Sequence, residues 1–328
     1  MTTKMDNSGF DLLSKSTAVQ YPSLALTPGE DLTGYALSKL GKAALFLVTC
    51  SSVFAVLLIF YFVVRESLIF LRQEPLLGVL TTNAWYPQSE DPRYGMLALL
   101  AGSVYVTLAA LAFSVPVGVM AAVFLSDLVS FRVRAVVKPV IEILAAIPSV
   151  AFGFFAVLVL APWMQDHWGL STGTNALNAA IILSIMALPT IISVAEDSIS
   201  SLGRELREAS YALGATRFET LFKVVIPAAH SGIIAAIILG MMRAIGETMV
   251  VWMASGNASQ IPTPWWDVTQ SVRTMTATIA GEMGETEHGS IHYGALFSVG
   301  VCLLVITFGL NMVSEFFLSR AKKALGKT

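Results

Sequence analysis

The chain has 328 residues, of which 55% are hydrophobic and 13% charged, and its formal net charge is −2. Its mean hydropathy of +0.72 excludes an ordinary water-soluble globular protein and indicates an integral membrane protein. Both cysteines, Cys50 and Cys302, fall in apolar stretches. No disulfide framework is therefore predicted.

Residues 1–41 form a polar N-terminal segment. They lack the charged start, short apolar core and small-residue cleavage site of a signal peptide. Apolar residues recur at helical spacing towards the end of the segment, at Leu32, Tyr35, Ala36, Leu37 and Leu40. We interpret the segment as a cytoplasmic tail that leads into a short helix on the membrane surface, with plain disorder to about residue 41 as the alternative.

Six apolar stretches are long enough to cross the roughly 30 Å hydrocarbon core of a bilayer, which takes about 20 residues. They lie at about 43–64, 96–125, 135–161, 176–195, 228–255 and 294–318. Prolines interrupt several of them, and membrane helices tolerate such kinks where neighbouring groups satisfy the freed carbonyls. The sequence predicts an all-α polytopic domain of six membrane helices at 42–319, followed by a basic cytoplasmic tail at 320–328.

Basic residues predict the orientation of these spans. With a cytoplasmic N-terminus, the inner segments hold fifteen Lys and Arg residues, and the outer loops hold Arg65, Arg72, Arg93 and Arg273. The positive-inside rule then predicts that both termini are cytoplasmic. The outer loops at about 65–95 and 256–293 are acidic, and we interpret most of their carboxylates, a set that contains Glu282, as solvated. We interpret His288 and His292 as residues of a solvated loop rather than of a metal site.

The polar, amphipathic stretch 204–227 lies between two strongly apolar stretches. Its first residues suit a helix, and Gly214 follows where a left-handed glycine would close that helix. Thr216 and Glu219 match a capping box that opens a second helix, which is predicted to stop at Pro227. A glycine corner between two short helices can present a compact surface to a groove on another protein.

This stretch resembles the EAA loop of binding-protein-dependent ABC importer permeases, whose pattern is E-A-A, three residues, G, nine residues and I-x-L-P. The matching residues are Glu208, Ala209, Ser210, Gly214 and Val224-Val225-Ile226-Pro227. The spacing is kept, and the departures are Ser210, Val224 and Ile226. The resemblance implies a cytoplasmic coupling loop at 196–227 that docks an ATPase through Glu208, Ala209, Gly214 and Pro227. The alternative is an ordinary amphipathic loop between spans.

Charged residues inside spans are functional candidates, because each costs roughly 2.5–3.5 kcal/mol to insert. Three stand out: Glu142, Arg243 and Glu247. Arg243 and Glu247 are four residues apart, so we predict that they share a helix face with the small residues Gly240, Ala236 and Gly232. Arg suits an oxyanion because its planar guanidinium donates two parallel hydrogen bonds and stays protonated. The alternative is that Arg243 and Glu247 only neutralise each other's charge and hold two helices together.

Glu142 lies one helical turn from Lys138, near the predicted cytoplasmic end of the third span. We favour an ion pair with Lys138, or a carboxylate that reaches the headgroups, over a gating role for Glu142.

The run Arg243-Ala244-Ile245-Gly246-Glu247-Thr248-Met249 is similar to the R-A-x-G-E-T-M segment of PstC-type permeases of phosphate-specific importers. Residues 276–285 and 139–149 also resemble that family, and the resemblance covers roughly 95–318. It implies a six-helix ABC importer type I permease fold that imports inorganic phosphate, with Arg243, Glu247 and Thr248 on the substrate path. It also implies a second permease subunit, two cytoplasmic ATPase subunits that hold ATP and Mg, and a periplasmic phosphate-binding protein.

A physical argument supports phosphate as the substrate. Near neutral pH phosphate still carries a proton that it can donate to a carboxylate, whereas sulfate does not. A carboxylate at Glu247 beside Arg243 would therefore favour phosphate over sulfate.

Other classes of protein fit the sequence less well. The zinc-protease motif H-E-x-x-H and the hydrolase motif G-x-S-x-G are missing, and the closing Gly326-Lys327-Thr328 lacks the earlier glycine of a P-loop, where Ala321 stands. We therefore expect a non-catalytic subunit, with no cofactor, metal or nucleic acid bound, in the cytoplasmic (inner) membrane of a prokaryote. A passive channel would not need an ATPase-docking loop. Permeases for sulfate, molybdate or tungstate, and the other phosphate permease subunit, stay open as alternatives.

Overall fold

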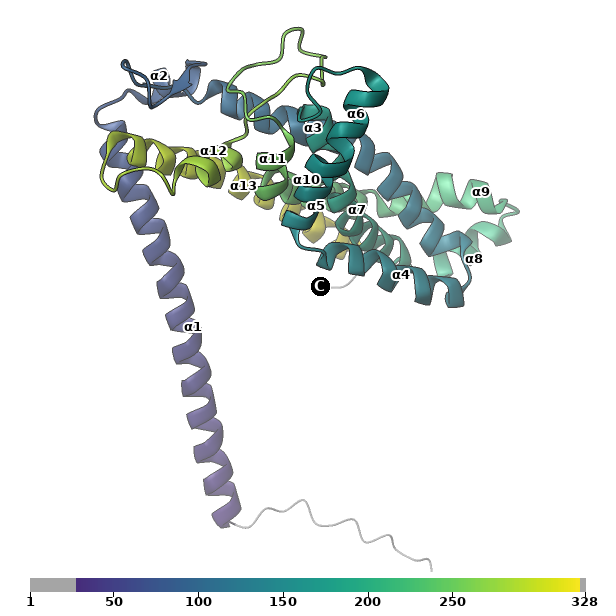
Figure 1. Ribbon diagram of the computed structural model, residues 1–328. Coiled ribbons are helices and arrows are strands. Elements are labelled where there is room, and N and C mark those ends of the chain that lie inside the picture. Colours follow the sequence, from purple (N-terminus) through teal and green to yellow (C-terminus); the bar gives the residue numbers. More distant parts are fainter. Residues whose placement is uncertain (1–27, 325–328) are drawn as a thin grey trace, which may run out of the picture. The chain divides into compact units, whose positions relative to one another are not determined.

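The computed structural model describes residues 28–324, which are mostly helical (Figure 1). The helical segments, three of them π-helical (η), are α1 (Pro28–Leu71), α2 (Leu76–Thr81), α3 (Leu97–Val123), η1 (Phe124–Leu128), α4 (Phe131–Ala146), α5 (Ser149–Phe155), η2 (Ala156–Leu160), α6 (Ala161–Trp168), α7 (Ala176–Ser200), α8 (Glu205–Ala212), α9 (Arg217–Thr220), η3 (Leu221–Val225), α10 (Ile226–Ile245), α11 (Met249–Ala254), α12 (Met275–Glu282) and α13 (Ile291–Ala324). Two short antiparallel strands, β1 (Trp85–Tyr86) and β2 (Arg93–Tyr94), join them. The predicted all-α class is confirmed.

The chain divides into two units, one ending at Phe60 and the other beginning at Tyr61. The first unit contains most of α1, and its side chains from Gly34 to Phe60 are all exposed. An apolar helix that buries no side chain against its own chain must be covered by lipid or by another protein. The predicted surface helix near residue 41 is instead the beginning of α1, and residues 1–27 lie outside the described part of the chain.

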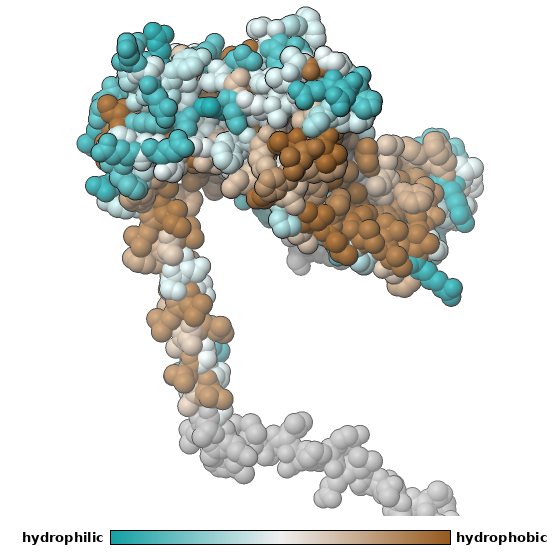
Figure 2. All heavy atoms as spheres, viewed as in Figure 1, coloured by the Kyte–Doolittle hydropathy of each residue, from teal (hydrophilic) through white to brown (hydrophobic). Residues whose placement is uncertain are grey.

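The six predicted spans correspond to six helices that are long and apolar enough to cross a membrane. These are Gly34–Leu71, Leu97–Leu128, Ser149–Trp168, Ala176–Ser200, Arg217–Ile245 and Ile291–Arg320. In the second unit, Figure 2 shows polar residues gathered around α2, α6 and the neighbouring loops, with a broad apolar surface beneath them. An apolar band bounded by polar ends is the surface that a multi-pass membrane protein presents to a bilayer.

The third predicted span, 135–161, has different bounds in the structure. The helix α4 ends at Ala146, Ile147 is extended with φ −65° and ψ 129°, and a new helix begins at Ser149. The reason is Pro148, whose ring disfavours helical backbone at the residue before it. The membrane-length helix is therefore Ser149–Trp168, and α4 is a separate segment.

The fifth predicted span also differs, because Pro227 does not stop a helix. One continuous helix runs from Arg217 to Ile245. The π-helical segment η3 ends two residues before Pro227, and η2 likewise ends two residues before Pro162. Proline lacks the N–H that would reach back four residues, and a π turn widens the helix where that hydrogen bond is lost.

The core of the second unit is built on α7, which packs between α3 and α10. Ile191 of α7 lies between two glycines, so that a Cβ on Gly118 would lie 2.8 Å from its Cγ2 and a Cβ on Gly240 2.5 Å from its Cγ1. Both glycines therefore serve close helix approach. At the other end of the unit, the last turns of α1 pack on α13, and the Ser67 and Ser298 hydroxyl oxygens are 2.9 Å apart.

Candidate functional site

The stretch predicted to be a coupling loop folds as two helices joined at a glycine corner. Gly214 has a φ of +83°, the left-handed conformation that the sequence predicts for it. The capping box is also present: the Thr216 hydroxyl accepts from the Glu219 N–H at 3.3 Å, and the Glu219 carboxylate accepts from the Thr216 N–H at 3.1 Å. The left-handed backbone of Gly214 therefore ends the first helix of the corner, and the capping box of Thr216 and Glu219 stabilises the start of the second helix.

A buried hydroxyl pair holds the two helices of the loop together. The Ser210 and Thr220 hydroxyl oxygens lie 2.9 Å apart, and both residues are buried. Ser210 is one of the departures from the family pattern, so its hydroxyl has a structural role that the family's Ala lacks. In contrast, Glu208 and Ala209 are exposed, and the Leu213 side chain at the corner is 90% exposed. These three residues are accessible to a partner protein.

Arg207 ties the loop to the ends of two membrane helices. Its Nε donates to Asp127 Oδ1 of η1 at 2.6 Å, and its Nη2 donates to the Ile199 carbonyl of α7 at 3.2 Å. Its Nη1 also donates to the Gly203 carbonyl at 2.5 Å. These hydrogen bonds hold the Arg207 side chain in one orientation, because each of them restricts the same planar guanidinium group.

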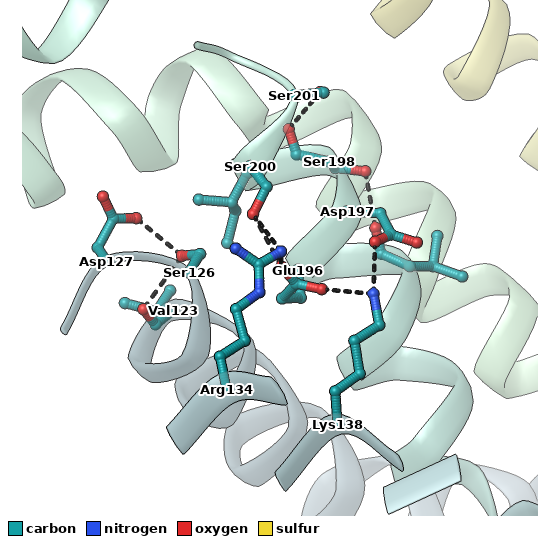
Figure 3. A network of polar contacts seen from close by, with 12 residues as sticks. Val123, Ser126, Asp127, Arg134, Lys138, Glu196, Asp197, Ser198, Ser200 and Ser201 are labelled. Atoms are coloured by element: carbon teal, nitrogen blue, oxygen red, sulfur yellow. Dashed lines mark hydrogen bonds and ion pairs between the residues drawn. The ribbon is translucent and has the colours of Figure 1, made fainter. Parts of the chain in front are cut away.

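A second ionic cluster joins α4 to α7 (Figure 3). Arg134 and Lys138 reach from one helix towards Glu196, whose side chain is 1% exposed, and both pair with it. The Lys138 Nζ lies 2.8 Å from Glu196 Oε2 and 2.8 Å from Asp197 Oδ1. The Ser200 hydroxyl donates to Glu196 Oε1 at 2.8 Å. Glu196 is thus a buried carboxylate satisfied by two cations and a hydroxyl.

The predicted pairing of Lys138 with Glu142 is wrong. Lys138 turns instead to the two carboxylates of α7, and Glu142 is exposed with no hydrogen-bond partner in residues 28–324. The physical reason is that a buried carboxylate must be paired, whereas an exposed one gains little from a neighbour one turn away. A gating role for Glu142 stays a prediction.

The predicted substrate-path residues lie at a helix break. The helix α10 ends at Ile245, and Glu247 and Thr248 lie in the link to α11. The carbonyl of Glu247 accepts from the Thr276 hydroxyl of α12 at 2.7 Å, and Gly246 supplies a residue that leaves a helix at low cost. Arg243 and Glu247 therefore do not share a helix face, and no ion pair joins them among the described residues.

Arg243 itself is exposed, on the last turn of α10. The small residues of α10, Gly240 among them, pack on α7 rather than line an opening beside the arginine. Lipid contact is costly for an exposed guanidinium. Arg243 is therefore suited to a water-filled path or to a second subunit.

Residues 114–323 match the family model described as binding-protein-dependent transport system inner membrane component. The chain belongs to this family. The permease is 40% identical over 243 residues to the probable ABC transporter permease protein YqgH of Bacillus subtilis, covering 74% of this chain and 78% of the relative. It is 33% identical over 266 residues to the phosphate transport system permease protein PstC of Mesorhizobium japonicum, covering 75% and 80%. The PstC-type resemblance is thereby confirmed.

A solved structure supports the fold of the permease. An inward-facing conformation of the MetNI methionine ABC transporter aligns with a TM-score of 0.50 at 17% identity, covering 76% of this chain and 98% of that chain. The ABC importer permease fold is thus shown by structural as well as sequence similarity, and the permease is a multi-pass membrane protein.

At the opposite end of the permease, the prediction that His292 lies in a solvated loop is wrong, because His292 is part of α13 and contacts Glu282 of α12, which is also largely buried. Its carboxylate accepts from three side chains: Trp85 Nε1 at 3.0 Å, Arg273 Nη1 at 2.6 Å and His292 Nε2 at 2.9 Å. These residues come from four separate segments, so the cluster joins β1, the loop before α12, α12 and α13. A cavity of about 400 Å³ borders it. Sequence gave no indication of this cluster beyond the presence of the residues.

Removing the buried carboxylate should destabilise the permease more than removing its exposed neighbour. In Glu196→Gln, Arg134 and Lys138 lose their shared anion, and we expect a loss of about 2–3 kcal/mol, less than the roughly 3–5 kcal/mol of a fully buried pair because both cations are partly solvated. The matched control is Asp197→Asn, whose side chain is 66% exposed and which should cost about 0–1 kcal/mol. Thermal unfolding of the purified assembly measures both, and equal shifts would contradict the prediction.

Proposed function

We propose that this permease is the PstC-type membrane subunit of an ABC importer that moves inorganic phosphate across the cytoplasmic membrane. The observation that carries the proposal is the similarity to phosphate transport permeases, which extends over three quarters of the chain. The coupling-loop geometry supports the ATP-driven part of the proposal, and the exposed Arg243 supports an anionic substrate. Sulfate, molybdate and tungstate are not favoured as substrates.

In this proposal the permease is a non-catalytic subunit. It pairs with a second permease subunit, two cytoplasmic ATPase subunits that hold ATP and Mg, and a periplasmic phosphate-binding protein, and itself binds no cofactor. The exposed Glu208 and Leu213 beside the Gly214 corner are the surface offered to an ATPase. The excess of basic residues in the segments that include this loop supports cytoplasmic termini.

The substrate path runs past the break between α10 and α11. Arg243 supplies a permanent positive charge and a fork of donors for the anion's oxygens. Glu247, in the link after the helix, supplies an acceptor for the proton that phosphate carries and sulfate lacks. Thr248 supplies a neutral hydroxyl in the same link. Since these groups are not locked to each other, they are available to an anion or to the second subunit.

Competition between oxyanions tests the assigned substrate. Proteoliposomes that contain the whole assembly, its phosphate-binding protein and internal ATP should accumulate labelled phosphate, and a large excess of sulfate should leave the rate unchanged. Proteoliposomes without internal ATP serve as the control and measure passive leakage of phosphate. ATP-driven accumulation of sulfate or molybdate at the rate of phosphate would overturn the assignment.

A further inference from the structure

A polar cavity of about 440 Å³ lies between the coupling loop and the ends of the membrane helices. It is bounded by η1, the beginning of α4, the end of α7 and both helices of the loop. Four arginines line it against a single carboxylate, that of Asp127: Arg134, Arg204, Arg207 and Arg217. This excess of cationic groups makes the cavity attractive to an anion.

The four arginines are not equivalent. Arg134 is paired with Glu196 and Arg207 with Asp127, so these two are already neutralised and held in place. Arg204 and Arg217 are exposed, and among residues 28–324 neither guanidinium group has a hydrogen bond or an ion pair to another side chain or to the backbone. The cavity therefore offers two guanidinium groups with unused donors, one beside each helix of the loop.

An apolar groove of about 650 Å³ adjoins this cavity. The two share Leu128, Arg217 and Leu221 in their linings. Every side chain that lines the groove is apolar except Arg217, and exposed large side chains form its walls: Met120, Phe124, Phe218 and Phe222. Arg217 therefore lies at the boundary between the cationic cavity and the apolar groove.

We propose that the cavity and groove together bind one anionic phospholipid. Its headgroup phosphate lies between Arg204 and Arg217, and an acyl chain lies along η1 and η3 in the groove. A basic pocket between membrane helices with an apolar surface beside it is suited to an anionic lipid, because the basic residues bind the headgroup while the apolar surface contacts the acyl chain. A free phosphate ion fits the cavity's charge but leaves the groove unexplained.

Such a lipid would contact both helices of the coupling loop and the end of α3 at the same time. The groove lies at one end of each of the membrane-length helices Leu97–Leu128 and Arg217–Ile245, and the ends of spanning helices are where lipid headgroups meet the hydrocarbon. Bound lipid would therefore hold the loop against the membrane helices. This inference stands on the cavity and groove alone and does not depend on which oxyanion is transported.

Native mass spectrometry of the purified, delipidated assembly tests the proposal, with dioleoylphosphatidylglycerol as the probe and dioleoylphosphatidylcholine as its neutral counterpart. The wild type should retain the anionic lipid and release the neutral one. In Arg204→Gln/Arg217→Gln the apparent Kd should rise roughly 30-fold, since each arginine near an anionic lipid contributes about a factor of five. The matched control, Arg132→Gln/Arg320→Gln, removes two exposed arginines that line neither site and should leave the Kd unchanged.

A second variant addresses the groove. Met120→Gln places a polar group in the acyl-chain site and should weaken retention of the lipid, while the mass of the intact assembly reports that it still forms. Equal retention by the wild type and the double arginine variant would overturn the proposal. Displacement of the lipid by millimolar inorganic phosphate would also overturn it, because it would assign the arginines to the free anion.

Discussion

Arg243→Gln is expected to lower ATP-driven phosphate uptake roughly 30-fold, because hydrogen bonds to a charged group contribute about 2 kcal/mol. Gln keeps a similar length and polarity but loses the permanent charge and the bidentate fork. Arg243 is exposed on the last turn of α10 and pairs with no carboxylate in the described chain, so its removal leaves no buried anion unpaired. The measurement is labelled phosphate uptake at matched membrane levels of the assembly.

The control for this variant is Arg320→Gln, which removes an exposed arginine at the far end of α13. It should leave uptake within about fivefold, which is the largest change that a surface charge contributing at most about 1 kcal/mol produces. Unchanged uptake in Arg243→Gln would remove this arginine from the substrate path. Loss of the assembly itself, with uptake falling only in proportion, would make Arg243 a residue of the subunit interface.

Gly214→Val is expected to leave the permease inserted but to uncouple it, with ATP-driven uptake falling at least tenfold. The φ of +83° costs a residue with a Cβ about 1–2 kcal/mol, and a β-branched residue more, so the corner would rearrange. No atom lies within 4 Å of the position where the Cβ would be built. The cost is therefore backbone strain and an altered docking surface rather than a clash inside the permease.

Gly289→Val separates these two causes. Gly289 has a φ of +80° and an equally open surrounding, but it lies in the loop before α13. If the docking surface matters, Gly289→Val keeps most of its uptake while Gly214→Val loses it and also loses the uptake-linked ATP hydrolysis of the assembly. Normal uptake by Gly214→Val would exclude the corner as the coupling contact.

Local sequence predicted the parts of the fold that depend on neighbouring residues. Apolar length was sufficient for the number of spans. A glycine placed after an amphipathic run, and a Thr followed by Glu three residues later, were sufficient for the left-handed corner and the capping box. In each case the partners lie within a few residues, so the spacing alone specifies the contact.

The errors arose where a distant partner decides the geometry. Lys138 pairs with Glu196, 58 residues away, and not with Glu142 one turn away. At the break after Ile245, the Thr276 hydroxyl donates a hydrogen bond to the carbonyl of Glu247. Glu282 gathers its donors from β1, the loop before α12 and α13. Helix periodicity contains no information on such contacts, because they follow from how helices are brought together.

The continuous helix from Arg217 to Ile245 connects the coupling loop to the region of Arg243. It starts three residues after the Gly214 corner and carries Arg243 on its last turn. With 29 residues it is about 43 Å long, so a tilt of about 10° at one end displaces the other by about 7 Å. The π turn η3 lies near the beginning of this helix, and the remainder, from Ile226 to Ile245, is regular α-helix. In the proposed importer, a small rotation of the corner would displace the end of the helix that carries Arg243.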